Sequence, residues 1–518
     1  MIILGYNSGS PHDGSVAIIK DGKIIFSIAS ERLTGKKHQS GIDKKIINYA
    51  LRKTNLDSSE IDYVAIAGDG HNMKIDSLLE AEDGIYHLTD FNRPNEYFSW
   101  KGETFLIPHH ICHTAAAYYT SGFDTAICYS LDTSDFDYHI LGPKLNNMIC
   151  KYQNHEIKDA YTPGHMYGVD YARVCQHIGL IPCLSKAGTM MGLSSFGTPE
   201  MLIPKEEMVS DNPDDYPKID DDFIAAIKYA YSAQKHLENN VIDYLIQLKE
   251  ENPDQENLCL SGGTFLNCNL NGKIVEKNIF KNVHHFPACG DDGLAVGAAL
   301  YAYHTVLGQP LVKHEDSQLV YLGGSNFLVD EIPFEKTIDA LIDGKIVAWA
   351  NGRSEFGPRA LGNRSILADP RNSWSRDKIN QMIKNREWFR PFAPICLEEH
   401  YQEYFDFPKP SPYMLYTAKV KKPGDIPACV HVDGTARFQT VNKEQNPDMH
   451  KLISMFYERT GVPILLNTSL NNRGKPICEI SDHVFWFLQD SELDCANIFG
   501  QWYDKRVDTW ITDTRQSH

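Results

Sequence analysis

The sequence lacks several features that mark common classes of protein. Its 12 cysteines include no CxxC pair and no regular spacing, which argues against a zinc ribbon and for reduced, mostly buried thiols. No apolar run reaches the roughly 20 residues of a membrane span, and the nearest, at 293–308, contains a histidine. The first residues show neither the basic lead nor the apolar stretch of a signal peptide. We therefore expect a cytoplasmic protein that does not enter a membrane.

Positive charge is also scarce. Lys and Arg number 50 against 68 Asp and Glu, which leaves a net charge of −18. Because duplex binding depends on neutralising phosphates with an excess of basic residues, we expect no nucleic-acid partner. The sign is inverted between Arg353 and Arg390, where nine basic and four acidic residues give a local net charge of +5. An anionic ligand is therefore expected to bind in that stretch.

The length of 518 residues, 42% of them hydrophobic, predicts a globular protein of two to four domains. Two strand-turn-strand units, with strands predicted at 2–6, 15–19 and 23–29 and at 125–131, 138–141 and 148–152, are each followed by helical segments, which predicts a duplicated nucleotide-binding α/β fold. Periodicity weakens at 304–327. We therefore predict an α/β first domain at 1–310, a linker at 311–330, and a second α+β domain at 331–518.

Three histidines crowd into the stretch HHICH. In a helix, His109 and His113 would stand one above the other on one face. Asp132, at the end of a predicted strand, and Asp291, in the loop GDDG, would complete a set of two histidines and two carboxylates. Such a set suits Fe(II), Mn(II) or Zn(II). The alternative is that this HxxxH spacing is incidental.

Glycine-rich turns follow two predicted strands. In SGGTFLN, Gly262 and Gly263 could bring backbone N–H groups and a helix N-terminus to a nucleotide phosphate, and Asn267 closes the motif. Tight strand-to-helix packing would explain the same glycines equally well. In GDDGLAVGAA the adjacent carboxylates would repel a phosphate unless a cation lies between them. A carboxylate at that position favours a metal.

The basic stretch contains arginines among Gly and Pro turns, as in EFGPRALGNR and REWFRPF. Guanidinium groups suit phosphate and carboxylate recognition. A network of Arg–carboxylate pairs is the alternative, but the nearby acidic residues could satisfy only some of these arginines. Arg437 lies in HVDGTARFQTV, and Asn467 and Ser469 follow an apolar strand, where ligand-binding loops usually lie. We expect an anion-binding pocket.

With these segments assembled, the chain resembles the O-carbamoyltransferases of the nodulation-factor and cephem antibiotic-tailoring type. The motifs that carry the resemblance run in order over nearly the whole chain: HDGS, HHICH, MGLSSFG, LSGGTFLNCNLN, PACGDDGLAVGAA, EFGPRALGNRSILADPR, REWFRPFAP, HVDGTARFQTV and LLNTSLN. The resemblance implies a first domain of the actin/hexokinase superfamily and a second, YrdC-like domain. After Asp132 this chain departs from the family's DGxG turn and has DTSDFD.

The resemblance also implies roles for individual residues. His109, His113, Asp132 and Asp291 match the family's iron-binding positions. The positions that hold carbamoyl phosphate and the adenylate are matched by Arg359, Lys384, Arg390, Arg437 and Ser469. On this basis ATP, with Mg, and carbamoyl phosphate would form carbamoyl adenylate, and the carbamoyl group would pass to a hydroxyl of a small molecule. His12 is a candidate base for that hydroxyl, and a homodimer is conceivable.

Two other functions stay open from the sequence alone. A tRNA threonylcarbamoyl transferase would keep the fold and change the substrate, although the acidic balance opposes it. A non-enzymatic, ATP-regulated actin-like module would need none of the Arg-rich motifs. The acceptor is not determined by these residues: an antibiotic or other natural product, a nucleoside and a sugar all fit.

Overall fold

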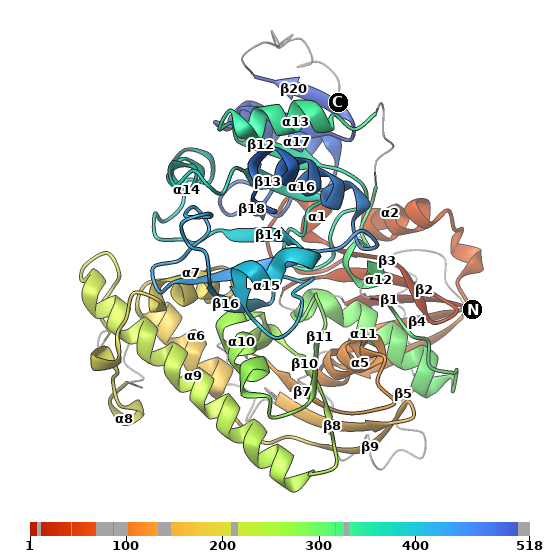
Figure 1. Cartoon of the computed structure of the whole chain (residues 1–518). Coiled ribbons are helices and arrows are strands. Elements are labelled where there is room, and N and C mark those ends of the chain that lie inside the picture. The colour runs from red at the N-terminus through yellow and green to blue at the C-terminus, as the bar shows by residue number, and fades with distance from the viewer. Residues whose placement is uncertain are drawn as a thin grey trace.

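The computed structural model describes residues 1–7, 12–42, 44–68, 86–87, 102–132, 147–208, 216–315, 317–325 and 331–505. In these residues the chain forms three β-sheets (Figure 1). The first two sheets use strands that precede residue 286, and the third uses strands from Val347 onward. We refer to these two regions as the N-terminal part and the C-terminal part.

The first sheet begins with the predicted meander. Strands β1, β2 and β3 pair antiparallel, and β4 and then β6 extend the sheet parallel to β1. Its strand order is β3-β2-β1-β4-β6-β5. The bounds are β1 (Ile2–Asn7), β2 (Ser15–Lys20), β3 (Lys23–Ala29), β4 (Tyr63–Gly68), β5 (Tyr86–His87) and β6 (Glu103–Pro108).

The second sheet repeats this arrangement. Strands β7, β8 and β9 pair antiparallel, and β10 and then β11 extend the sheet parallel to β7. This equivalence of order and direction confirms the predicted duplication; the strand predicted at 138–141 lies outside the described residues. The bounds are β7 (Thr125–Leu131), β8 (Asn147–Gln153), β9 (Glu156–Tyr161), β10 (Asn257–Ser261) and β11 (Asn282–His285).

Two small-residue helices fill the space between these sheets. Helix α5 (His109–Ser121) packs on the second sheet, α11 (Leu294–Tyr301) packs on the first, and the two helices contact each other. The alanine and glycine content of both helices explains this close approach. A Cβ added at Gly297 would lie 1.8 Å from the carbonyl oxygen of Cys112. The N-termini of both helices are thereby held together at one edge of the duplicated fold.

Helices cover the other face of the second sheet. Alternate residues of β7, Ile127, Tyr129 and Leu131, join the cluster formed with these helices, as period-two alternation requires. The longest is α9 (Phe223–Glu251), which starts where the Asp222 side chain accepts a hydrogen bond from Ala225 N at 2.9 Å. The other described helices of the N-terminal part are α1 (Glu31–Thr34), α2 (Lys44–Thr54), α6 (Tyr167–His177), α7 (Cys183–Ser194), α8 (Lys205–Met208) and α10 (Cys268–Lys277).

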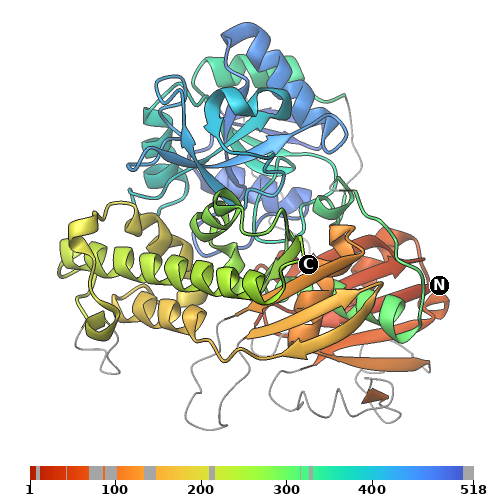
Figure 2. The ribbon, with the colours of Figure 1, turned by 60° about the horizontal axis from the view of Figure 1, so that its bottom comes forward.

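The C-terminal part is built on a mixed sheet of order β15-β16-β17-β14-β18-β13-β12-β19-β20. In Figure 2 it lies above the two N-terminal sheets and α9. The strands are β12 (Val347–Ala350), β13 (Arg364–Ala368), β14 (Ala393–Leu397), β15 (Phe405–Asp406), β16 (Tyr416–Val420), β17 (Thr435–Val441), β18 (Ile464–Ser469), β19 (Cys495–Ile498) and β20 (Gln501–Asp504). Its helices are α13 (Phe334–Ile342), α14 (Trp374–Lys378), α15 (Tyr401–Tyr404), α16 (Pro447–Thr460) and α17 (Ser481–Asp490).

The described residues 317–325 of the segment predicted as a linker are packed at the junction of the two parts. They include the short helix α12 (Ser317–Val320), and Leu319 and Leu322 are buried. The carbonyl oxygen of Leu322 accepts a hydrogen bond from Ser27 N at 2.9 Å. Apolar side chains of both parts also share one buried cluster. The division at 310 and 331 into separate domains stays a prediction.

Two expectations drawn from the composition, on the cysteines and on membrane spans, can be compared with the structure. All 12 cysteines are free and buried, which confirms the predicted burial of the thiols. Among the described residues no helix is both long enough and apolar enough to cross a bilayer.

Candidate metal centre and basic cluster

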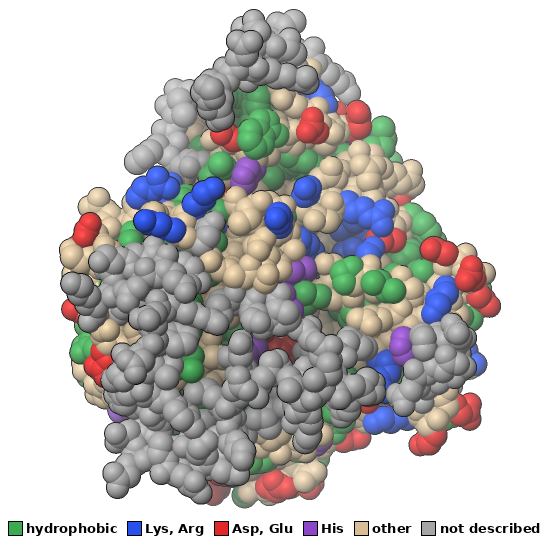
Figure 3. Space-filling model, turned by 180° about the vertical axis from the view of Figure 1, so that it is seen from behind, with side chains coloured by type: hydrophobic (Ala, Val, Ile, Leu, Met, Phe, Trp, Pro, Cys, Tyr) green, Lys and Arg blue, Asp and Glu red, His purple; other side chains and the backbone are tan. Residues whose placement is uncertain are grey.

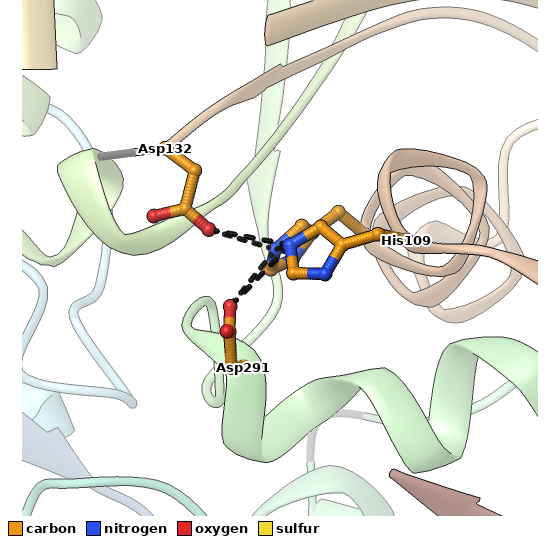
Figure 4. A group of neighbouring side chains, drawn as sticks. His109, Asp132 and Asp291 are labelled. Atoms are coloured by element: carbon orange, nitrogen blue, oxygen red, sulfur yellow. Dashed lines mark hydrogen bonds and ion pairs between the residues drawn. The ribbon is translucent and has the colours of Figure 1, made fainter. Parts of the chain in front are cut away.

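Four side chains that the sequence proposed as metal ligands lie together, and we call them the His/Asp cluster. His113 Nε2 lies 3.1 Å from Asp132 Oδ2 and 3.3 Å from Asp291 Oδ1, and His109 Nε2 lies 3.6 Å from each of these oxygens. Figure 4 shows both carboxylates pointing toward the imidazoles. One ligand atom from each residue lies within 4.8 Å of all the others.

The fold brings these ligands together from three places. His109 and His113 are one helical turn apart at the start of α5. Asp132 directly follows β7, and Asp291 begins the turn that leads into α11. Because α5 and α11 start at the same edge of the duplicated fold, their N-termini present these groups to one point. Residues 133–137, which complete the sequence DTSDFD, lie outside the described residues.

The charges around the His/Asp cluster fit a cation. Burial alone would lower the pKa of His113, but Asp132 and Asp291 raise it to about 9. Burial, together with the charges of Asp13, Glu31 and Asp291, raises the pKa of Asp292 to about 8. This excess of negative charge at converging imidazole and carboxylate groups suits a divalent ion such as Fe(II), Mn(II) or Zn(II).

His12 lies beside the His/Asp cluster. Its Nδ1 is 3.0 Å from Asp13 Oδ2 and 3.8 Å from Asp291 Oδ2. His38 also contacts Asp13, with Nδ1 2.9 Å from Oδ1. Asn7 Nδ2 donates at 3.0 Å to the carbonyl oxygens of both Asp13 and Asp291. The loop that carries the candidate base is therefore fastened to a member of the His/Asp cluster.

The glycine turn after β10 also supports the His/Asp cluster. Gly262 has a φ of +96°, and its N–H donates to Cys289 O at 2.8 Å. The N–H of Gly263 donates to Asp132 Oδ1 at 3.2 Å. Asn267 caps α10 by accepting from Leu270 N. The N–H groups of Gly262 and Gly263 thus donate hydrogen bonds to protein atoms in this structure. A role of Gly262, Gly263 and Asn267 in nucleotide binding stays a prediction.

A second group of predicted residues gathers in the C-terminal part, and we call it the basic cluster. Its members are cationic side chains close enough to influence one another's charge: the predicted residues Arg359, Lys384, Arg390 and Arg437, and Arg386, which was not predicted. Four of these residues lie in the basic stretch between Arg353 and Arg390, and Arg437 lies in β17. Figure 3 shows Lys and Arg side chains gathered on one face, with histidine side chains nearby.

Lys384 is enclosed by oxygen acceptors from one strand end. Its Nζ donates to Ser469 Oγ at 3.1 Å and to Asn471 O at 2.9 Å. Asn467, two residues before Ser469 on β18, donates to Ala360 O at 3.1 Å, and its Oδ1 is buried with no hydrogen bond. Lys384 and Ser469 are therefore held as one unit, and Asn467 offers it a neighbouring acceptor.

The basic cluster is electrostatically strained without an anion. Burial and then the charges of Arg437 and Arg390 lower the pKa of Arg359 to about 9. Burial and neighbouring cations also lower the pKa of Lys384 and of Arg386. The Nε atoms of Arg359 and Arg437 are buried and donate no hydrogen bond. A bound anion would relieve this repulsion and accept these donors.

Contacts between the two parts join the basic cluster to the N-terminal fold. Arg359 Nη2 donates to Leu266 O at 2.9 Å, in the glycine turn. Arg390 Nη1 donates to Thr189 Oγ1 on α7 at 3.0 Å. The sequence did not predict this contact of α7, because a threonine on a helix gives no signal of a partner 200 residues away.

An ion pair strengthens the same contact. Lys186 Nζ, also on α7, lies 2.5 Å from Glu387 Oε1. Burial would raise the pKa of Glu387, but Lys186 and Arg390 lower it to about 2. Glu387 therefore stays ionised, and its negative charge is shared between Lys186 and Arg390 of the basic cluster.

Comparison with known proteins covers nearly the whole chain. The Carbamoyltransferase N-terminus model matches residues 3–82, 99–212 and 207–300, and the Carbamoyltransferase C-terminus model matches 338–505. Nodulation protein NolNO of Sinorhizobium fredii is 31% identical, over 93% of this chain and 77% of that protein. The 3'-hydroxymethylcephem-O-carbamoyltransferase of Amycolatopsis lactamdurans is 28% identical, over 97% of this chain and 99% of that protein.

Solved structures give more distant matches. The ROK hexokinase from Thermus thermophilus is 12% identical with a TM-score of 0.34, over 58% of this chain and 98% of that chain. HypF from T. kodakarensis is 14% identical with a TM-score of 0.33, over 58% of this chain and 47% of that chain. The two family models together span both parts of the fold, and the chain belongs to the carbamoyltransferase family, as an enzyme that transfers carbamoyl groups.

Proposed function

We propose that the protein is an ATP-dependent O-carbamoyltransferase with two reaction centres. The basic cluster would bind carbamoyl phosphate and ATP. With one water, carbamoyl phosphate would give carbamate and phosphate, and attack of carbamate on the α-phosphorus of ATP would give carbamoyl adenylate and pyrophosphate. The observation that carries this proposal is the cluster of mutually close cations, in which Lys384 is buried and Arg359 and Arg437 each keep a buried Nε that donates no hydrogen bond among the described residues.

The chemistry explains why a nucleotide is needed. A carbamoyl carbonyl is a poor electrophile because its nitrogen donates electron density, so a mixed anhydride with a good leaving group must form first. Placing two polyanions side by side requires cations that offset their repulsion. Arg359, Lys384 and Arg390 would serve that purpose, with Arg437 and Ser469 as further contacts.

Transfer would then take place in the N-terminal part. The His/Asp cluster would hold a divalent metal, with Fe(II) as the expected ion and Mn or Zn as alternatives, and such an ion would act as a Lewis acid toward the carbamoyl carbonyl. His12, fixed by Asp13, would take the proton of the acceptor hydroxyl. ATP would enter with Mg.

A hydroxyl-bearing small molecule is the proposed acceptor. The name of the Amycolatopsis relative specifies transfer to the oxygen of a hydroxymethylcephem. We extend to this chain only the class of acceptor: the hydroxyl of a natural product, nucleoside or sugar.

The test is pyrophosphate release that depends on carbamoyl phosphate. Arg359→Ala should lower that rate on the order of 10²–10³-fold, the usual cost of removing one preorganised donor at a charged centre. Arg376→Ala is the matched control, because Arg376 pairs with exposed Asp377 instead. Normal release in Arg359→Ala would remove the basic cluster from adenylate formation.

A further inference from the structure

Glu355 uses its carboxylate differently from the other acidic residues of the basic stretch. Those three, Asp369, Asp377 and Glu387, each form an ion pair with a lysine or arginine. Glu355 is only 2% exposed and directs its carboxylate to backbone N–H groups instead. Because an ionised carboxylate is costly to bury, the hydrogen bonds that it makes there indicate its role.

One oxygen of Glu355 holds three N–H groups. Oε1 accepts hydrogen bonds from Leu361 N and Asn363 N, both at 2.7 Å, and from Arg364 N at 3.0 Å. Oε2 is buried and has no hydrogen bond among the described residues. The donors come six, eight and nine residues after Glu355, so the chain curls back onto its own first residue. We call residues 355–364 the carboxylate-centred turn.

Arg359 lies in the middle of the carboxylate-centred turn. Its Nη2 donates to Leu266 O at 2.9 Å, and its Nε is buried and donates no hydrogen bond among the described residues. The carbonyl oxygen of Ala360 accepts from Asn467 Nδ2 at 3.1 Å, which ties the turn to β18. The direction of the Arg359 side chain therefore depends on the backbone of this turn.

Three backbone N–H groups would lose their acceptor without the Glu355 carboxylate. Buried backbone donors are almost always paired, so the turn would rearrange until these groups found water or another acceptor. Such a rearrangement would move Arg359, because Arg359 lies between Glu355 and the three donors.

We propose that Glu355 is a positioning residue, whose carboxylate closes the turn that presents Arg359 to carbamoyl phosphate. This inference rests on the proposed function, which assigns Arg359 to that substrate. The charge of Glu355 and its hydrogen bonds act in opposite directions. A negative charge near the basic cluster disfavours an anion, whereas a closed turn that fixes Arg359 favours one.

The test is calorimetric binding of carbamoyl phosphate to the full chain. Glu355→Gln removes the negative charge, which by electrostatics alone would strengthen anion binding. Its amide is a weaker acceptor than a carboxylate, so we expect the turn to open and the affinity to fall about tenfold. Glu355→Asp keeps the charge but withdraws the oxygen from the three donors. It should weaken binding as well, and it carries the same comparison if Glu355→Gln does not fold.

A double-mutant cycle shows whether Glu355 acts through Arg359. Glu355→Gln should weaken binding about tenfold in the unchanged protein but less than about twofold when Arg359→Ala is already present. The alternative is that Glu355 only balances the charge of Arg364, whose side chain is fully buried. In that case the loss would be the same in both backgrounds.

Glu479→Gln is the matched control. Glu479 is also buried, and its Oε1 accepts from Gly324 N at 2.9 Å and from Tyr49 Oη at 3.2 Å, both outside the carboxylate-centred turn. Its Oε2 likewise has no hydrogen bond among the described residues. This variant should unfold at a lower temperature but bind carbamoyl phosphate with unchanged affinity.

The contrary results are distinct. Unchanged or tighter binding by the Glu355 variants would overturn the inference, as would equal losses with and without Arg359. An equal loss of affinity in Glu479→Gln would also overturn it, because any buried carboxylate would then have the same effect. Failure of the unchanged protein to bind carbamoyl phosphate would instead contradict the proposed function itself.

Discussion

His113 is the member of the His/Asp cluster that the fold encloses most fully, with 1% of its side chain exposed. We predict that His113→Ala abolishes metal binding and carbamoyl transfer but leaves pyrophosphate release measurable, because the basic cluster lies in the C-terminal part. Metal content of the purified variant and carbamoyl-phosphate-dependent pyrophosphate release are the measurements. Loss of both activities together would argue against two separate centres.

His110→Asn provides the matched control for that experiment. His110 is also buried on α5, but its Nδ1 lies 2.9 Å from Ser130 Oγ, and it is not one of the four residues of the His/Asp cluster. The variant can keep this hydrogen bond, and we expect it to retain the metal. Equal metal loss in both variants would mean that damage to α5, and not loss of a ligand, causes the effect.

The residue types of the His/Asp cluster could be predicted because their chemistry is rare and their spacing is local. The i, i+4 histidines and the strand-end aspartates are visible in the sequence, and the fold brings all four together. Their supporting contacts could not be predicted. Asn7 and the pair formed by Asp13 and His38 act through hydrogen bonds between distant or irregular segments, for which the sequence has no periodic signal.

At the scale of elements, the turn between β10 and α10 depends on a left-handed glycine. Gly262 has a φ of +96°, and a Cβ there would lie 2.4 Å from Leu131 O. We predict that Gly262→Ala destabilises the protein by about 1–3 kcal/mol and displaces Asp132, so that metal affinity falls as well. Thermal unfolding and metal titration would measure both effects.

Gly188, on α7, is the matched control for Gly262. A Cβ at Gly188 meets nothing within 4 Å, and alanine is favoured over glycine in a helix. Gly188→Ala should therefore unfold at the same or a higher temperature with unchanged metal affinity. Equal unfolding temperatures for the two variants would contradict the role given to the turn.

Helix α7 is expected to tune the basic cluster from outside it. Without Lys186, the Glu387 carboxylate would pair more closely with Arg390, whose Nη1 already lies 3.7 Å from Glu387 Oε2, and would offset part of the positive charge that an anion needs. We predict that Lys186→Ala weakens carbamoyl phosphate binding about threefold to tenfold, the size of a partly exposed ion pair. Calorimetry would measure the affinity, and Lys228→Ala, on the exposed side of α9, should leave it unchanged. Unaltered affinity in Lys186→Ala would contradict this electrostatic role.

Regular elements were the most predictable part of the fold. The strands at Lys23–Ala29 and Thr125–Leu131 have the predicted bounds, because alternating apolar residues and flanking turns define them locally. The packed segment at 317–325 was predicted as part of a linker because it is rich in turn residues and has no regular apolar pattern. That pattern gave no sign that Leu319 and Leu322 are buried. Burial of so short a segment depends on both parts of the molecule, which no local pattern encodes.

For the whole molecule, buried neutral histidines predict loss of stability in acid. Burial lowers the pKa of His284 to about 3, and burial lowers those of His304 and His314 to about 4. The unfolded value is about 6.5. Below that pH the unfolded chain takes up protons that the folded chain excludes, so the free energy of unfolding falls as the pH drops from about 6.5 toward 4.

His304→Phe tests this dependence. The ring of His304 stacks on Tyr119, with ring centroids 4.6 Å apart, so phenylalanine can occupy the same space without a titrating group. The fall in unfolding temperature between pH 7 and pH 5 should be smaller in the variant. An identical fall in both proteins would show that His304 does not contribute to acid sensitivity.

The two-centre account is tested most directly by following α-labelled ATP with the purified protein and carbamoyl phosphate. The account predicts that label passes to carbamoyl adenylate and then AMP, with one pyrophosphate released per ATP, and only when carbamoyl phosphate is present. Formation of labelled ADP, or no consumption of ATP with both substrates present, would contradict it.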